Sequence, residues 1–189
     1  MSSSTSKQII GNFVSALGAK QATPGGGAAA AVGASIGGAA AQMSAAYTKR
    51  KKDVESGAAG KADELIQSIN VEQYLQAADD DAEAYANLQK TWKKDSGITP
   101  EEKKQIEDRA LHVPVNLLEH CHSNIMNIKT FLPHCNPNIT SDAKVGIHLL
   151  AGSARSAYQT AMVNSPPEEE KMRLQQLLKE IRDVEDEIL

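Results

Sequence analysis

The stretch Thr23-Pro24-Gly25-Gly26-Gly27-Ala28-Ala29-Ala30 decides the fold, because it opens a long uncharged run that ends at Lys49-Arg50-Lys51-Lys52. The run is rich in alanine, glycine and serine. A helix of this composition gains little by burying bulk, so we expect neighbouring backbones to approach it closely. Its three leading glycines leave backbone N–H groups open, and the helix dipole makes that end attractive to anions. We therefore predict a close-packed helix from about residue 27 to residue 52, closed by cations.

The rest of the chain also has helical spacing and no convincing strand. Of its 189 residues, 41% are hydrophobic but only 4% are aromatic, which favours a core of close-packed aliphatic helices. We predict an all-α fold: a single domain, 1–189, built as a bundle of long Ala/Gly-rich helices, with a flexible tail at 1–6 and a charged C-terminal helix at 167–189. Apolar periodicity and helix-start signals place the other helices at about 7–19, 62–92 with a bend near Asn70, 99–131 with Pro114 as a kink or break, and 141–164.

Charge and composition exclude several functional classes. The net charge of −4 gives no support for a nucleic-acid binder. Two cysteines do not make a disulfide framework, and residues 1–6 lack the features of a secretion signal, so we expect a reduced, cytoplasmic location. The uncharged run at 21–48 is long enough to cross a bilayer. It is only weakly apolar, however, and we expect a buried helix and no membrane partner.

One acidic residue stands on an apolar helical stripe. Helix phase places Asp81 on one face with Ala78, Tyr85 and Leu88, whereas Asp79 falls on the opposite side. A carboxylate on an apolar face must be paired, hydrogen-bonded or protonated, and burial raises its pKa toward the range useful for acid–base chemistry. Two interpretations stay open: a catalytic group, or a structural aspartate bonded to a neighbouring helix end.

Three further groups of residues have both a structural and a functional interpretation. The four cations at 49–52 can complement a helix dipole, or they can hold an anionic ligand. Ser141-Asp142 can cap a helix, or it can direct a carboxylate into a cleft. The His and Cys residues at 120–122 and 134–135 have no zinc-ligand spacing, so we predict no metal site.

Several motifs, in a fixed order, resemble those of one enzyme family. The segment at 24–30 is similar to a PGGGSAAA signature with Ala28 in the serine place, and 48–52 is similar to TxGKKK with Arg50 in the glycine place. Residues 81–85 match D-x-x-A-F/Y, and 136–142 resemble N-x-N followed by SD. Residues 157–164 are similar to A-x-x-N-x-x-x-N: the final Asn164 matches, and Thr160 replaces the first asparagine. Together with Pro114, these motifs resemble the cyclodeaminase domain of formiminotransferase-cyclodeaminase and the related bacterial methenyltetrahydrofolate cyclohydrolases.

The resemblance implies an enzyme of folate metabolism. It implies an all-helical homodimer or higher oligomer that takes a tetrahydrofolate derivative as substrate and needs no cofactor. The reaction implied is conversion of 5-formiminotetrahydrofolate to 5,10-methenyltetrahydrofolate with release of ammonia. The catalytic residues implied are Asp81, Lys51 and Asp142. The substrate-binding residues implied are Pro24, Gly25, Gly26, Gly27, Lys49, Lys52, Tyr85, Ser141 and Asn164.

Within that resemblance, the roles differ between segments. Asp81 is the expected acid–base group, and the lysines hold the glutamate carboxylates of the folate or tune proton transfer. The glycine loop allows close approach of the pterin or of a second subunit, and Ser141 with Asp142 orders the far wall. Two alternatives stay open: a methenyltetrahydrofolate cyclohydrolase using the same site, and a non-catalytic dimer that binds folate or a protein. The sequence shows no transferase domain, so we expect a separate formiminotransferase as a partner.

Overall fold

The computed structural model describes residues 9–93 and 97–189, and over that part of the chain the regular structure is helical throughout. This confirms the predicted all-α class. The predicted tail at 1–6, the first residues of the helix expected at 7–19, and residues 94–96 of the following loop lie outside the described residues. The helices are α1 (Ile10–Leu17), α2 (Gly26–Ala46), α3 (Lys51–Glu55), α4 (Ala58–Ser68), α5 (Val71–Thr91), α6 (Pro100–Phe131), the short 3₁₀ helix η2 (Leu132–His134), α7 (Thr140–Val163) and α8 (Glu168–Ile188).

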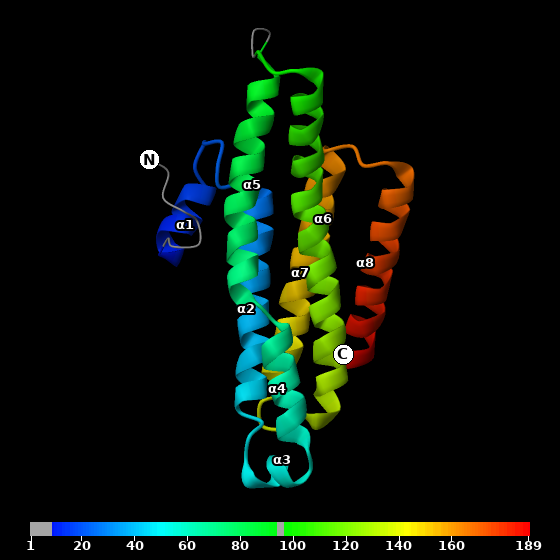
Figure 1. Ribbon diagram of the computed structural model, residues 1–189. Coiled ribbons are helices and arrows are strands. Elements are labelled where there is room, and N and C mark those ends of the chain that lie inside the picture. The colour runs from blue at the N-terminus through cyan, green and yellow to red at the C-terminus, as the bar shows by residue number, and fades with distance from the viewer. Residues whose placement is uncertain (1–8, 94–96) are drawn as a thin grey trace.

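Four long helices form the body of the molecule. In Figure 1, α2, α5, α6 and α7 run along one common direction, and each contacts its neighbours in the cyclic order α2, α7, α6, α5. The short α4 extends the α5 edge and packs on α2 and α6. Helix α8 covers the outside of α6 and α7 with its seam of Leu174, Ile181, Val184 and Ile188, all of which are buried. The charged C-terminal helix therefore docks on its own chain.

The backbones of α2 and α7 approach each other closely at two glycines. A Cβ atom at Gly146 would lie 2.9 Å from the carbonyl oxygen of Gly37, closer than real Cβ atoms approach an oxygen. A Cβ at Gly37 would lie 2.9 Å from the Cβ of Leu149. The close approach of another backbone to the small-residue helix, expected from composition, is thus confirmed.

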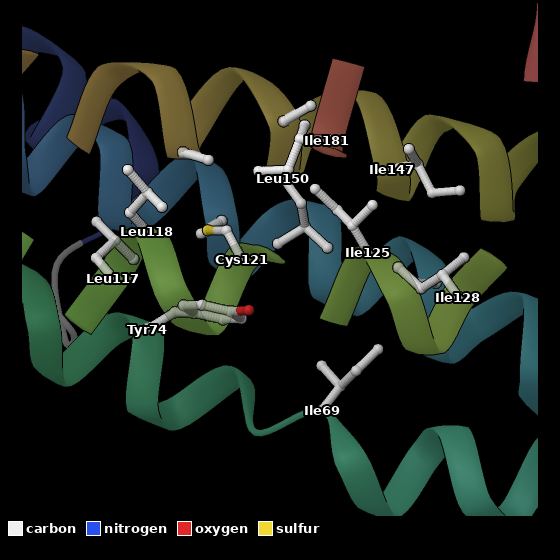
Figure 2. Close-up of a cluster of buried hydrophobic side chains, with 14 of the residues drawn as sticks. Ile69, Tyr74, Leu117, Leu118, Cys121, Ile125, Ile128, Ile147, Leu150 and Ile181 are labelled. Carbon is white, nitrogen blue, oxygen red and sulfur yellow. The ribbon is translucent and has the colours of Figure 1, made fainter. Parts of the chain in front are cut away.

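The main core lies between these helices (Figure 2). Aliphatic side chains from α6, α7 and α8 fill it, among them Ile125, Leu150 and Ile181, and none of these three is exposed. Tyr74 of α5 is also buried there. Its hydroxyl donates to the carbonyl oxygen of His120 at 3.2 Å and accepts from the Asn124 amide at 2.6 Å, which satisfies both polar partners inside the core.

The predicted end of the small-residue helix was wrong. Helix α2 ends at Ala46, and the cations lie in the following turn and in α3. The buried Thr48 hydroxyl donates to the Ser44 carbonyl and accepts from the Asn136 N–H at 3.0 Å, which ties the turn to the segment after α6. Arg50 directly precedes α3, and the Asp53 carboxylate accepts from its backbone N–H at 2.8 Å, which caps the start of the helix. These contacts end one helix and begin another.

Two other predictions about helix continuity differ from the structure. The helix predicted at 62–92 is two helices, α4 and α5, because the Asn70 side chain accepts from the Gln73 N–H and caps α5. In contrast, Pro114 does not interrupt α6, which is continuous over 32 residues. The predicted start of α6 is confirmed: Thr99 and Glu102 form a reciprocal capping box ahead of Pro100. Within residues 9–93 and 97–189, no helix is both long and apolar enough to span a bilayer.

Candidate functional site

A pocket of about 610 Å³ opens where the start of α2 meets the second half of α5. The C-terminal end of α7 and one residue of α6 close its other sides. The described lining contains one carboxylate and no lysine or arginine. The lining residues are Ala22, Thr23, Gly25, Gly26, Gly27, Asp81, Ala84, Tyr85, Leu88, Trp92, Ala110, Gln159, Thr160, Val163 and Asn164.

Asp81 lies against the start of α2. Its Oδ2 accepts a hydrogen bond from the Ala28 N–H at 3.0 Å, in the first turn of the helix. The residue that precedes this helix, Gly25, has no side chain to cap it. Asp81 therefore supplies from α5 the cap that helix starts usually take from their own side chain. This is the structural interpretation left open from sequence, and it does not exclude chemistry at the remaining carboxylate oxygen.

Gly27 makes this contact possible. A Cβ atom at position 27 would overlap the Asp81 carboxylate, so no other residue fits there while the carboxylate keeps its place. The neighbouring Gly25 and Gly26 line the same pocket. The glycine signature therefore brings the backbone of α2 against an acidic side chain from another helix.

The electrostatics of Asp81 suit proton transfer. Burial raises the pKa of this carboxyl above its ordinary value, and the hydrogen bond from Ala28 opposes part of that rise. No cation lines the described pocket to stabilise the charge further. A carboxyl whose pKa is raised toward neutrality exchanges protons more readily at working pH than an ordinary aspartate does.

The far wall comes from α7 and is held to α6. The Asn164 Nδ2 donates to the Ala110 carbonyl oxygen at 3.0 Å and to the Thr160 carbonyl oxygen at 3.2 Å. The Thr160 hydroxyl donates to the Ser156 carbonyl oxygen at 3.3 Å. Both side chains thus line the pocket with part of their bonding capacity already used within the chain.

The structure brings together only part of the predicted site. The pocket contains Gly25, Gly26, Gly27, Asp81, Tyr85 and Asn164, and the buried Pro24 lies between the lining residues Thr23 and Gly25. The other predicted residues lie at the far end of the bundle. Lys49, Lys51 and Lys52 follow the end of α2, and Ser141 and Asp142 lie in the first turn of α7. At 1.5 Å per residue, the 21 residues of α2 separate the two groups by about 30 Å (Figure 1).

At that far end, the polar residues contact one another. Lys49 pairs with Asp63 of α4, and Lys51 lies 3.9 Å from Glu55. Ser141 donates to the neighbouring Asp142 carboxylate. The guanidinium of Arg50, which departs from the family motif, forms two hydrogen bonds to Asp53, and Arg50 does not line the pocket. Of the three departures, Arg50 therefore lies outside the candidate site, whereas Thr160 lines its pocket and Ala28 donates to Asp81.

Sequence reasoning missed several lining residues. Leu88 and Trp92 share the helical stripe of Asp81 and Tyr85, so the periodicity already carried a signal for them. Gln159 and Val163 come from α7, and nothing local in their sequence marks them as pocket residues. Ala110 lies in α6 opposite Asn164 and contributes its backbone, which sequence patterns do not report.

The histidines and cysteines do not form a second site in the described part of the chain. Burial raises the pKa of the Cys121 thiol to about 12, which makes it a poor nucleophile. His122 contacts Glu180 of α8 at 2.7 Å. Across residues 9–93 and 97–189, no group of three or more His, Cys, Asp or Glu residues could hold a metal ion.

Comparison with known proteins defines the family. The family model described as formiminotransferase-cyclodeaminase matches residues 9–183. The chain belongs to this family. Among solved structures, a formiminotetrahydrofolate cyclodeaminase from Thermotoga maritima is similar, with a TM-score of 0.79 and 19% identity over 95% of this chain and 91% of that chain. No curated protein matches the chain. At this identity, the structural likeness shows the fold alone.

Proposed function

We propose that the protein is a formiminotetrahydrofolate cyclodeaminase, which converts 5-formiminotetrahydrofolate to 5,10-methenyltetrahydrofolate and ammonia. The observation that carries the proposal is the Asp81 carboxyl, whose pKa burial raises, in a largely apolar pocket built on the family's glycine signature. Family membership supports the substrate class.

The reaction needs one proton carrier in a position to act twice. The formimino group enters as its protonated amidinium, N10 of the substrate attacks the formimino carbon, and N10 must then lose its proton. The amino group formed on that carbon must gain a proton before it leaves as ammonia. A carboxylate at Asp81 accepts the first proton and returns it to the leaving amine, so that the protons balance over one turnover. General acid–base catalysis of this kind contributes about 10²- to 10⁴-fold.

The pocket walls support the remaining requirements. An apolar enclosure excludes bulk water, which would otherwise attack the methenyl product. The Ala28 N–H in the first turn of α2 stabilises the charged Asp81 carboxylate before the first transfer and after the second. Asn164, held by Ala110, offers its side-chain carbonyl oxygen as a further acceptor for substrate N–H groups.

The predicted homodimer is part of this proposal. Exposed apolar side chains extend along the α2–α7 face, including Ile36, Met43, Val145 and Leu149. A groove of about 590 Å³ on this face shares Gly26, Gln159 and Thr160 with the pocket. A second copy packed antiparallel on this face would place its cationic end, with Lys49, Lys51 and Lys52, near the pocket, whose described lining has no cation. The charge on Leu149→Glu would then prevent dimerisation, as measured by light scattering.

The catalytic role is tested with a matched pair of substitutions. Asp81→Asn keeps an oxygen that accepts from Ala28 but removes proton transfer, so kcat should fall by about 100-fold or more. Asp80→Asn makes the same change one residue away, at a side chain that contacts Gln76 and Arg109 outside the pocket, and should leave kcat unchanged. Formation of the methenyl chromophore from 5-formiminotetrahydrofolate gives the rate, and circular dichroism verifies the fold. An Asp81→Asn variant with full activity would remove Asp81 from the mechanism.

The same assay separates the alternatives. Faster loss of the methenyl chromophore than in a blank, with no reaction of the formimino compound, would identify a cyclohydrolase. Folate binding without either reaction would identify a non-catalytic protein, and Thr160 would then be the first position to restore to asparagine.

A further inference from the structure

The pocket carries an exposed aromatic pair at the end of α5. Trp92 is the one tryptophan in the chain, and 62% of it is exposed. Tyr85, on the same stripe, is 38% exposed, whereas Phe13, Tyr74 and Phe131 are buried. A chain with so few aromatic residues has therefore placed its largest one outside the core, on the wall of its candidate site. Single exposed apolar residues are ordinary, but neighbouring ones around a pocket indicate binding.

The two rings face the pocket as a pair. Their centroids lie 6.1 Å apart with an interplanar angle of 81°, which is an edge-to-face arrangement. They are seven positions apart in sequence, or about 10 Å of helix rise, so the rings lean toward each other. In an edge-to-face pair, the flat faces are not all covered, which leaves room for a third ring. Leu88, between them on the stripe, gives the wall an apolar base.

Their distance from Asp81 sets which part of a ligand they reach. Tyr85 lies one helical turn beyond Asp81, about 6 Å along the axis, and the paired rings extend from there toward Trp92. A ring attached directly to the reacting nitrogen atoms would lie over this wall while those atoms stay at the carboxylate. A ligand without such a ring would leave the aromatic pair in contact with water.

We propose that Trp92 and Tyr85 form a stacking wall that binds a flat conjugated ring of the substrate, next to the group that reacts at Asp81. The inference rests on the proposed function, in which the ligand is a folate. Two rings of a folate have this chemistry: the aryl ring that carries N10, and the pterin. Trp92 acts in binding and does not take part in proton transfer. Its loss therefore raises KM and leaves kcat unchanged.

The single tryptophan provides a direct readout that does not depend on turnover. 5-Formyltetrahydrofolate is titrated into the protein while Trp92 emission is followed, with correction for absorbance by the ligand. Equilibrium dialysis measures the Kd of the same ligand independently for the parent, Trp92→Ala, Trp92→Phe and Met172→Ala. Met172, an exposed apolar residue of α8, is the matched control. Light scattering records the oligomeric state of each variant.

Three results together would support the stacking wall. Trp92 emission should be quenched to saturation in the parent, and the Kd should rise by about 5- to 10-fold in Trp92→Ala. Trp92→Phe and Met172→Ala should bind with near-parent affinity. Titration of p-aminobenzoylglutamate and of pterin-6-carboxylate then identifies which ring quenches. Binding by dialysis with unchanged emission and unchanged Kd in Trp92→Ala would overturn the inference and leave the proposed function intact. An altered oligomeric state in Trp92→Ala, with unchanged Kd, would reassign the pair to a subunit contact. No binding to the parent by dialysis would overturn the proposed function together with this inference.

Discussion

Replacing Gly27 with alanine is expected to destabilise the protein, although alanine is the better helix former. In a helix interior, this change alone stabilises by about 0.5–1 kcal/mol. The added methyl group would overlap the Asp81 carboxylate, which must move away from the Ala28 N–H. Loss of a hydrogen bond to a charged group costs about 1.5–3 kcal/mol, and displacing packed atoms adds to that cost. The net expectation is a loss of about 1–3 kcal/mol in the free energy of unfolding.

Urea unfolding followed by circular dichroism measures this change. Gly60→Ala is the matched control, because an added Cβ at Gly60 in α4 would meet no atom within 4 Å outside its own helical turn. This variant should be slightly more stable than the parent. In an Asp81→Ala background, Gly27→Ala should no longer destabilise, since the overlapping carboxylate is gone. The double-mutant cycle isolates that coupling. A Gly27→Ala variant as stable as the parent, or one whose cost persists without Asp81, would refute the reasoning.

Three other predictions follow from described contacts. Gly146→Ala should lower the free energy of unfolding by about 1–3 kcal/mol, because the added methyl group meets the Gly37 carbonyl oxygen. Gly152→Ala should not, because the space beside Gly152 is open. Equal urea midpoints for the two variants would contradict this prediction. The hydrogen bonds from Arg50 lower the pKa of Asp53 to about 2, so this pair stabilises the fold above the ordinary aspartate pKa and is lost as pH falls toward 2. Asp53→Asn should therefore be less stable near neutral pH and lose less stability in an acid titration than the parent. Burial raises the pKa of Asp81, so ionisation of this carboxyl opposes folding. The parent should therefore lose stability relative to Asp81→Asn as pH rises through that raised pKa. A stability difference between the two proteins that stays constant across the pH titration would contradict this prediction.

Elements with local signals were predictable from sequence. The start of α6 follows from Thr99, Pro100 and Glu102, which act within one turn of each other. The seam of α8 follows from apolar spacing. The end of α2 was not predictable in the same way, because Thr48 contacts Asn136, which is 88 residues away in sequence. Uncharged sequence continued past the true end, and hydrogen bonds from the distant Asn136 hold the turn in place.

The residues of the candidate site were also predictable only where the signal is local in sequence. Helix phase alone selected Asp81, and the motif order added the glycines and Asn164. Neither phase nor order states which ends of two helices meet in space. The predicted site therefore included the lysines at 49–52 and the Asp142 carboxylate. In the structure, the length of α2 separates the lysines from the pocket. A site completed by a second copy, as proposed above, would leave this ambiguity in any single sequence.

The glycine contact between α2 and α7 has a mechanical consequence. Long side chains between helices act as a compliant layer, since they change rotamer when one helix slides past another. Where Gly37 meets Gly146, the backbones touch directly, and there is no such layer to absorb a displacement. A ligand that shifts the first turn of α2 would therefore move the whole rod, including the turn at 47–50 that Thr48 ties to Asn136. We therefore expect the two ends of α2 to be stiffly linked, so that a displacement of one end would be transmitted to the other.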